Sequence, residues 1–293
     1  MKYILLTSAK NEEDYIAKAL ESVVRQSVLP VAWVIVDDAS TDRTGSIIQT
    51  YAARHSFIHG LSAGSGEERN FGSKDKAIQA AYARVKGLAA EFVGVQDADV
   101  APEDRDYYET VLRQFDRDPR LGLTGGCVYE RVGEEWQHRM SSWDDSIPGC
   151  VQMFRRECFE RIGGFQRLDY GGSDTAAQLE VERLGWKAYT CRDRKVWHYR
   201  TTSSAGGVWQ GCFRSGLCDA SFGCHPLFEV CKCLHRLPSP PFGGSMVRLC
   251  GYFWWRVVRR EPLISRELVS FLRRREMTKL RRTILPFQGR YQP

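Results

Sequence analysis

The segment Glu91-Phe-Val-Gly-Val-Gln-Asp-Ala-Asp99 is an apolar run that ends in two carboxylates one residue apart. The run is typical of a buried strand, so Asp97 and Asp99 are expected where that strand leaves a sheet. Two carboxylates this close together are unfavourable unless positive charge lies between them. A Mg²⁺ or Mn²⁺ ion that carries a diphosphate would meet this need, because hard cations prefer carboxylate, phosphate and water oxygens. Taken alone, this segment also fits an acidic turn after a strand, so the choice between the two interpretations depends on the other motifs of the chain.

Strand-like and helix-like segments alternate over the first 125 residues. Apolar runs predict strands at 3–7, 33–36, 57–61, 92–96 and 121–129. Helical spacing predicts helices between them, with Asn11 and Asp42 as N-caps of the first two. This alternation indicates βαβ units and a parallel sheet. Ligands of such sheets bind at the carboxyl ends of strands, where the sequence has polar clusters at 8–12, 37–38 and 97–99.

Two common phosphate-binding sequences do not occur in the chain. No Gly-x-Gly-x-x-Gly follows the first predicted strand, and no Walker-type Gly-x-x-x-x-Gly-Lys-Ser/Thr is found. Both motifs use glycine-rich backbone to approach phosphate groups closely. Dinucleotide-binding and P-loop interpretations are therefore disfavoured.

The middle of the chain carries weaker structural signals. Residues 130–148 are polar and loop-like, and residues 154–165 predict a short helix that ends at a glycine. Asp174 begins a further predicted helix that runs to residue 184. Short strands are predicted at 187–191 and 195–198, and the Ser- and Gly-rich stretch 201–207 predicts a mobile loop.

Length and composition indicate a globular protein. The 293 residues are 43% hydrophobic and 27% charged, which suits one large α/β domain with an appendage. No apolar run approaches the roughly 20 residues that span a bilayer, and residues 1–7 become polar too soon for a signal peptide. We therefore expect an intracellular, cytoplasmic protein. Its ten cysteines are expected to be reduced, buried hydrophobes, with a metal-binding or lipidated cluster at 212–233 as the alternative.

The C-terminal part of the chain is basic and aromatic. Residues 246–293 contain 12 Lys or Arg and 3 Asp or Glu, a local charge of +9 that leaves −3 for residues 1–245. Trp254 and Trp255 precede Arg256, Arg259 and Arg260, a pattern that suits the headgroup region of an anionic membrane. Packing of this tail on the body of the protein is the open alternative. Nucleic-acid binding is disfavoured because no groove reader or stacking platform is recognisable.

Six short motifs, in this order and spacing, resemble family 2 glycosyltransferases with the GT-A fold over roughly residues 1–200. They are Asn11-Glu12, Val34-Ile-Val-Asp-Asp-Ala-Ser-Thr-Asp-Arg-Thr44, Arg69-Asn-Phe-Gly72, Gln96-Asp-Ala-Asp99, the Ile-Gly-Gly-Phe ending of 155–165, and Gly171-Gly-Ser-Asp174. The resemblance implies an α/β fold, a mixed sheet flanked by helices, with a GT-A catalytic domain at 1–205. Within it, about 1–125 would bind the nucleotide sugar and 126–205 would form the acceptor side. A basic, aromatic-rich helical extension would occupy 206–293.

The resemblance assigns donor contacts to the strand ends. Asp38 would accept a hydrogen bond from the nucleotide base, which suits the imide N–H of uracil or thymine; the alternative is that Asp37 and Asp38 only cap the following turn. A UDP-sugar is the favoured donor, with dTDP- and GDP-sugars as alternatives. The alternative for Arg69 and Lys74 is that they are only solvent-exposed charges at the start of a helix. The implied donor contacts, besides Asp38, are Ala9, Glu12, Arg69, Lys74, Asp97 and Ala98.

A metal site is also implied at the Asp-x-Asp motif. Asp99 would ligate Mn²⁺ or Mg²⁺ directly, Asp97 would support it or touch the ribose, and His198 would be a third ligand. The ion would neutralise charge on the leaving nucleoside diphosphate. A purely structural role for His198 stays open, because a lone histidine is often structural.

Asp174 resembles the general base of inverting family members, which takes the proton from the acceptor hydroxyl. Ser173 stands where the family usually has Glu, so acceptor contacts are expected to differ. An N-cap role for Asp174 is compatible with catalysis. A second departure is Ser8-Ala-Lys10 in place of the usual Pro-x-aromatic sequence, so stacking on the base from this segment is not expected.

The sequence thus predicts an inverting, metal-dependent glycosyltransferase. It would move a sugar from a nucleotide-diphosphate donor to a hydroxyl of a saccharide or lipid-linked saccharide, as a peripheral protein on the cytoplasmic face of a membrane. A sugar-phosphate nucleotidyltransferase is one rival, although it should carry a glycine-rich basic loop that residues 8–12 lack. The other rival is a non-catalytic saccharide-binding or membrane scaffold protein.

Overall fold

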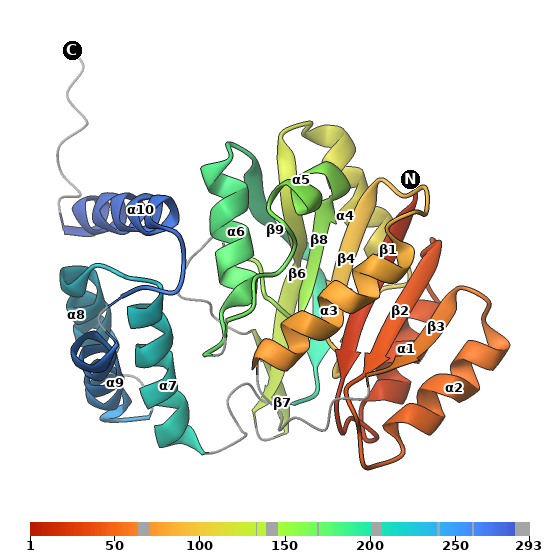
Figure 1. The fold of residues 1–293 in the computed structure, drawn as a ribbon, viewed down its shortest axis with the longest axis horizontal. Coiled ribbons are helices and arrows are strands. Elements are labelled where there is room, and N and C mark those ends of the chain that lie inside the picture. Colours follow the sequence, from red (N-terminus) through yellow and green to blue (C-terminus); the bar gives the residue numbers. More distant parts are fainter. Residues whose placement is uncertain are drawn as a thin grey trace. The chain divides into compact units, whose positions relative to one another are not determined.

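The computed structural model describes residues 1–63, 71–132, 134–138, 146–168, 170–200, 207–238, 241–259 and 261–284. The chain separates into two compact units, Met1–Thr202 and Ser203–Pro293. Each unit has its own arrangement of helices or strands (Figure 1). No helix in the described ranges is long and apolar enough to cross a membrane.

The first unit is built on a sheet that has nine strands within the described residues, with helices on both faces (Figure 1). The strand order is β3-β2-β1-β4-β8-β6-β9-β5, and β7 pairs with β6 outside this path. The strands are β1 (Tyr3–Ala9), β2 (Ala32–Asp37), β3 (Ile58–Ser62), β4 (Phe92–Gln96), β5 (Val100–Pro102), β6 (Leu121–Val132), β7 (Glu135–His138), β8 (Val151–Arg155) and β9 (Lys187–His198).

The sheet is mixed. Strands β3, β2, β1 and β4 run parallel to one another, while β8 is antiparallel to both β4 and β6. Strand β9 is parallel to β6 and antiparallel to β5. The parallel block confirms the expected alternation of strands and helices, and the antiparallel strands confirm the expected mixed sheet.

Two apolar layers hold the helices of this unit against the sheet. One layer joins the sheet to the first, second and fourth helices, and includes Ile16, Ile48 and Val111. The other joins it to the third, fifth and sixth helices, and includes Ile78 and Phe159. Burial on both faces explains why the central strands are apolar without interruption. The helices are α1 (Ile16–Val24), α2 (Thr44–Arg54), α3 (Phe71–Val85), α4 (Tyr107–Arg117), α5 (Arg156–Arg161) and α6 (Ser173–Arg183).

Two local predictions in the middle of the chain are wrong, and a third, the short helix over 154–165, is confirmed as α5 with a strand, β8, before it. The sequence predicts a loop over 130–148, whereas β6 continues to Val132 and β7 occupies Glu135–His138. Residues 139–145 of this predicted loop lie outside the described residues. The two short strands predicted at 187–191 and 195–198 are a single strand, β9, with an irregularity opposite Gly126 and Cys127. Pairing across the sheet supplies partners for these polar segments that the local sequence does not reveal.

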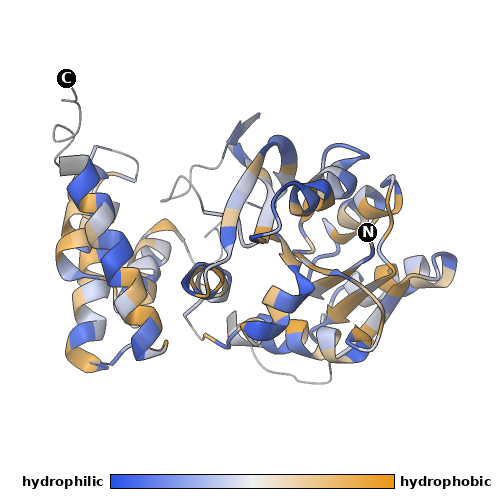
Figure 2. Cartoon of the chain, turned by 90° about the horizontal axis from the view of Figure 1, so that it is seen from above, coloured by the Kyte–Doolittle hydropathy of each residue, from blue (hydrophilic) through white to orange (hydrophobic). Residues whose placement is uncertain are grey.

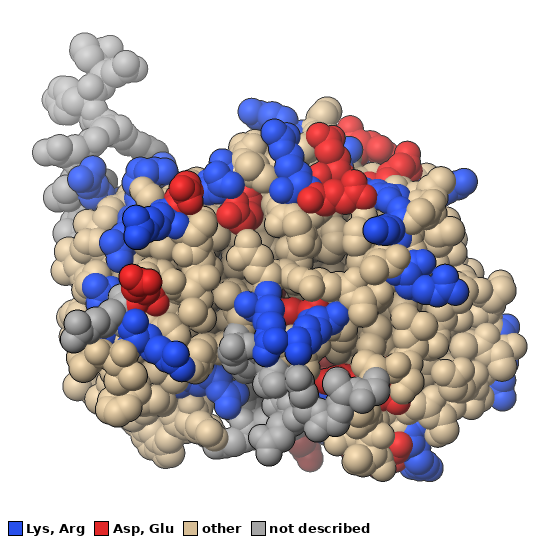
Figure 3. Space-filling view, in the orientation of Figure 1, with Lys and Arg blue, Asp and Glu red and all other residues tan. Residues whose placement is uncertain are grey.

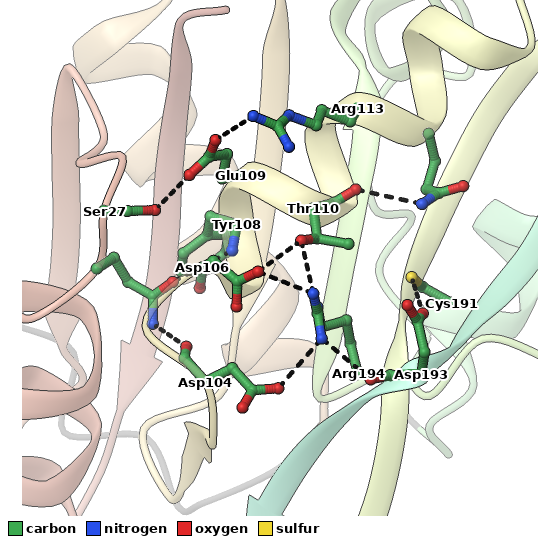
Figure 4. Close-up of polar contacts among 12 residues, drawn as sticks. Ser27, Asp104, Asp106, Tyr108, Glu109, Thr110, Arg113, Cys191, Asp193 and Arg194 are labelled. Atoms are coloured by element: carbon green, nitrogen blue, oxygen red, sulfur yellow. Dashed lines mark hydrogen bonds and ion pairs between the residues drawn. The ribbon is translucent and has the colours of Figure 1, made fainter.

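An arginine fixes β9 against the start of α4. The guanidinium of Arg194 donates to Asp106 at 2.8 Å and to Thr110 at 2.9 Å, and reaches Asp104 at 3.4 Å (Figure 4). The same strand continues from Arg194 to His198. This contact therefore braces the strand that carries one of the predicted metal ligands.

The second unit is helical, with α7 (Val208–Ser221), α8 (Pro226–His235), α9 (Gly244–Val258) and α10 (Arg266–Ile284) among the described residues. Glycines let α7 and α9 approach closely. A Cβ atom at Gly216 would overlap the carbonyl oxygen of Arg248, and one at Gly251 would overlap that of Phe213. Figure 2 shows hydrophobic and hydrophilic residues interspersed along these helices.

A buried ionic network lies inside the helical unit. Lys232 of α8 bridges Asp219 of α7 at 2.7 Å and Glu229 at 2.5 Å, and Arg248 of α9 pairs with the same two carboxylates. Burial raises the pKa of Asp219, but the two cations outweigh it and lower the pKa to about 2. Since removal of one partner leaves a buried charge uncompensated, the network ties three helices together specifically.

Glu276 of α10 is a further buried acid in this unit, and among the described residues it forms no ion pair like those of Asp219 and Glu229. Its side chain is 0% exposed, and one of its carboxylate oxygens accepts a hydrogen bond from the backbone amide of His225 at 2.7 Å. Burial raises the pKa of Glu276 from 4.5 to about 7, although hydrogen bonds from His225 and Cys224 oppose the rise. The folded unit therefore favours the protonated acid.

This acid predicts a pH-dependent stability. As pH rises, the unfolded chain loses the Glu276 proton near its ordinary pKa of 4.5, whereas the folded chain keeps it until about pH 7. Stability from this group is therefore complete below pH 4.5 and falls as pH rises to 7, by up to about 3 kcal/mol. Glu276→Gln should remove this part of the pH dependence, measured by urea unfolding of the full chain across this range.

Glu267→Gln is the matched control, because Glu267 lies exposed on the same helix. It should keep the wild-type pH dependence. Equal pH slopes for the wild type and Glu276→Gln would contradict the assignment.

Candidate active site

Asp38 lies just past β2, where the register of the parallel strands pairs Asp37 with Ala9. The Asp38 amide donates to the Ala9 carbonyl at 2.8 Å. The Asp38 side chain is buried, and its carboxylate lies 3.7 Å from the ammonium group of Lys10. The strand end thus holds a buried carboxylate next to a cation.

The neighbouring Asp37 has a different environment. Its carboxylate accepts the amide of Ser40 at 3.0 Å, which closes the turn after β2. Asn11 helps to hold this turn, because its side-chain oxygen accepts the amide of Thr41 at 2.8 Å. The predicted N-cap role of Asn11 is wrong: α1 begins at Ile16, and Asn11 has a left-handed φ of 53°. Asn11 instead links the loops that follow β1 and β2.

Asp97 is paired with Lys74 from the first turns of α3. The two side chains meet at 2.5 Å, and the Asp97 amide donates to the carbonyl of Cys150 at 2.9 Å. Burial lowers the pKa of Lys74, but Asp97 and, more weakly, Asp174 outweigh this and raise it. Lys74 is therefore a permanently charged group that faces both the Asp-x-Asp motif and the predicted base.

Asp99 and His198 form the second pair of the motif. The Nε2 atom of His198 lies 3.5 Å from Asp99, and its Nδ1 atom lies 3.2 Å from Glu130 on the neighbouring strand β6. All three side chains are largely buried. Burial lowers the pKa of His198, but hydrogen bonds with Asp99 and Glu130 outweigh it and raise the pKa to about 9.

Arg200 is the cation that completes this cluster. Its Nε atom lies 3.6 Å from Asp99, and its terminal nitrogen pairs with the buried carboxylate of Glu12. Burial raises the pKa of Asp99, but His198 and Arg200 together lower it below its usual value. Glu12 thus positions Arg200 beside the Asp-x-Asp motif.

The chemistry of Asp99 and His198 fits a divalent cation. A carboxylate and an imidazole face each other, and Glu130 lies behind the imidazole as orienting carboxylates do for ligating histidines. Asp97 forms an ion pair with Lys74. Within the described ranges, no group of three or more His, Cys, Asp or Glu side chains is placed to hold a metal ion. Further ligands would come from phosphate and water oxygens. The metal roles of Asp97, Asp99 and His198 stay predictions.

Asp174 lies in the first turn of α6, whose N-cap is Gly172 in a left-handed conformation with φ of 89°. Its carboxylate packs directly on the backbone of Gly149, where a Cβ atom would overlap it. Gly149 precedes Cys150, whose backbone carbonyl accepts a hydrogen bond from the Asp97 amide. The predicted base is thereby held beside the Asp97–Lys74 pair.

A buried aspartate, Asp75, contacts both the segment that precedes α6 and the first residue of that helix. Asp75 of α3 is 0% exposed and accepts the amide of Leu168 at 3.2 Å. Burial raises the pKa of Asp75, while hydrogen bonding to Ser173 and Leu168 opposes the rise. Ser173, which replaces the usual acid of the resembled family, thus serves to anchor the helix that carries Asp174.

The structure gathers most of the predicted residues and adds others. Ala9 and Ala98 are buried, and Ala9 contributes its carbonyl to Asp38. Arg69 lies outside the described residues. Sequence reasoning missed four supporting residues. Arg200 was detectable, since it lies two positions after His198 and so on the same side of the chain; the others depend on contacts between distant segments. The four are Lys10, Asp75, Glu130 and Arg200.

Solved structures with a similar fold are GT-A glycosyltransferases. The mannosyltransferase PcManGT from Pyrobaculum calidifontis, in complex with GDP-Man and Mn²⁺, matches with a TM-score of 0.57 and 15% identity over 98% of this chain and 88% of that one. TarS 1–349 of S. aureus, in complex with UDP-GlcNAc, matches with a TM-score of 0.53 and 13% identity over 97% and 82% of the two chains. At these identities the likeness shows the fold alone, which is the GT-A fold.

Sequence comparisons give the family. The model for glycosyl transferase family 2 matches residues 5–175, and the chain belongs to this family. The probable glycosyltransferase YdaM of Bacillus subtilis (strain 168) is 26% identical over 213 residues, 63% of this chain and 47% of YdaM. The putative glycosyltransferase EpsH of the same strain is 35% identical over 141 residues, 47% of this chain and 36% of EpsH. The chain spans about half or less of the length of these relatives.

The contact between Gly149 and Asp174 predicts a sharp steric effect. Gly149→Ala would force the Asp174 carboxylate or the backbone to move, because the new methyl group would occupy its position. We expect a loss of about 1–3 kcal/mol in the free energy of unfolding, measured by urea denaturation. Gly87→Ala is the control, since a Cβ atom there meets nothing within 4 Å, and it should be neutral or slightly stabilising. Equal stability of the two variants would refute the packing.

Proposed function

We propose that this protein is an inverting, metal-dependent glycosyltransferase that uses a nucleotide-diphosphate sugar. The observation that carries the proposal is the link between the two halves of the site. Lys74 forms an ion pair with Asp97, and the negative charge of Asp174 also raises the pKa of Lys74. A leaving diphosphate is stabilised by positive charge such as that of Lys74, and an attacking hydroxyl needs a base such as Asp174. Both groups belong to the end of the sheet where ligands of such folds bind.

Donor binding is assigned to the strand ends of the parallel block. Asp38 would accept the imide N–H of uracil or thymine, a role that its buried position beside Lys10 supports. Lys74 and Arg200 would offer positive charge to the diphosphate. Similar folds hold GDP-Man, UDP and UDP-GlcNAc, which supports a nucleotide-sugar donor. A UDP-sugar is favoured, with dTDP- and GDP-sugars as the alternatives.

Mn²⁺ or Mg²⁺ would be held by Asp99 and His198, with Asp97 in support. Bound there, the ion would supply charge neutralisation of the leaving nucleoside diphosphate. The Mn²⁺ present in the PcManGT complex supports this use of a divalent ion. Glu130 would orient the imidazole of His198.

Asp174 would act as the general base. Its carboxylate would take the proton from the acceptor hydroxyl while that oxygen attacks the anomeric carbon opposite the leaving group, which inverts the configuration. Gly149 and Asp75 hold this carboxylate and its helix in place. The acceptor would be a saccharide or a lipid-linked saccharide at the cytoplasmic face of a membrane.

Asp174→Asn tests the base directly. The amide cannot take a proton, so kcat should fall by about 100-fold or more while the KM for the donor changes little. Thermal shift with Mn²⁺ first selects the UDP-, GDP- and dTDP-sugars that bind the protein. Transfer from the selected donors to saccharide acceptors is then measured as release of the nucleoside diphosphate. Asp116→Asn, on the exposed side of α4, should behave as the wild type. Unchanged turnover of Asp174→Asn would refute the role.

Asp99→Ala tests the metal site separately from the base. Calorimetry of UDP binding should show a gain of affinity on adding Mn²⁺ for the wild type, and a gain at least about tenfold smaller for the variant. Asp116→Ala is the control and should keep the wild-type response. Full turnover after exhaustive chelation would exclude the proposed metal dependence and leave the base assignment standing.

A further inference from the structure

Helix α9 has two different faces. Tyr252 and Trp255 point into the helical unit, and Trp255 is only 3% exposed. The opposite face is formed by residues 246, 250, 253, 254 and 257, whose spacing of three and four places them in one stripe along the helix. We call this set the outward stripe of α9.

The outward stripe is apolar and open to solvent. Met246 is 55% exposed, Trp254 is 58% exposed and Val257 is 71% exposed. Phe253 is 46% exposed, and Cys250 is also exposed. A helix that is apolar on both sides is normally buried on both sides, and a contiguous exposed apolar surface usually marks a binding site. The two adjacent tryptophans of the tail thus have separate roles, one in the core and one on the surface.

The charge of the unit identifies the partner. Residues 203–293 contain fifteen Lys or Arg and five Asp or Glu, a net charge of +10, whereas residues 1–202 carry −4. On the visible face of the helical unit, Lys and Arg cover more surface than Asp and Glu do (Figure 3). Arg256 and Arg259 are exposed near the C-terminal end of the stripe. Two copies of such a unit would repel each other, while an anionic surface would be attracted.

We infer that the outward stripe of α9 docks this protein on an anionic lipid bilayer. Met246, Phe253, Trp254 and Val257 enter the boundary between headgroups and acyl chains, where an aromatic ring such as that of Trp254 is favoured. The net positive charge of the helical unit, to which the exposed Arg256 and Arg259 contribute, attracts the lipid phosphates. Both contributions act together, since apolar insertion and basic charge are each weak alone. This inference goes beyond the proposed function, because docking requires no catalysis.

Vesicle co-sedimentation of the full chain tests the inference. The wild type should bind vesicles of phosphatidylglycerol mixed with phosphatidylcholine, and bind phosphatidylcholine alone at least about tenfold more weakly. Trp254→Glu combined with Val257→Glu should lower binding to the anionic vesicles by about tenfold or more. Tryptophan quenching by brominated lipid should be reduced in the conservative variant Trp254→Phe.

Matched controls separate the surface from general charge and folding effects. Leu29→Glu combined with Leu88→Glu adds the same charge at exposed apolar positions of the first unit, and should bind nearly as the wild type. Arg256→Gln with Arg259→Gln should weaken binding to anionic vesicles more than Arg84→Gln with Arg117→Gln. Circular dichroism and thermal unfolding confirm that each variant is folded. Asp174→Asn should bind vesicles as the wild type does, so a failed catalytic assignment would not affect this test.

Three results would overturn the inference. The first is wild-type vesicle binding by the folded Trp254→Glu, Val257→Glu variant. The second is equal binding to neutral and anionic vesicles. The third is a dimer in sedimentation velocity that this variant abolishes, because the outward stripe would then be covered by a second copy of the chain.

Discussion

Repulsion among carboxylates at one edge of the sheet is the constraint on which the site depends. Parallel pairing of β1, β2 and β4 brings acidic residues from separate loops to neighbouring strand ends. Each is balanced by a cation from another segment: Lys10 for Asp38, Lys74 for Asp97, and Arg200 with His198 for Asp99. Since unbalanced buried charge destabilises a fold strongly, these cations let the acidic edge exist before any ligand arrives. The proposed donor would enter a site whose charges are already paired.

The parts of the fold that local sequence encodes were predictable. Apolar runs predicted the strands of the parallel block, and helical spacing predicted the helices between them, although α1 begins at Ile16 rather than directly after Asn11. Asp38, Asp97 and Asp99 could be placed because a strand end is a local feature. The contact of Glu130 with His198 could not, since it depends on the register between β6 and β9, which are far apart in the sequence. Asp75 was hidden for a similar reason: its partners, Leu168 and Ser173, lie on a segment about 90 residues away.

The two units solve the problem of buried charge in different ways. In the first, charged pairs gather at the edge of the sheet, where ligands of such folds bind. In the second, Asp219, Glu229, Lys232 and Arg248 pair inside a helical core. A buried ion pair adds little net stability, but removing one partner leaves a costly unpaired charge. These pairs therefore disfavour arrangements of the helices that would separate their members.

The close glycine contact between α7 and α9 has a consequence for mutational tolerance. Gly216 and Gly251 admit no side chain, so the inward positions of α9 are sterically fixed. The outward positions touch little and would accept polar residues at small cost to folding. Random drift would therefore replace outward apolar residues sooner than inward ones. Retention of Trp254 and Val257 among near relatives would have to reflect selection for something other than a stable fold.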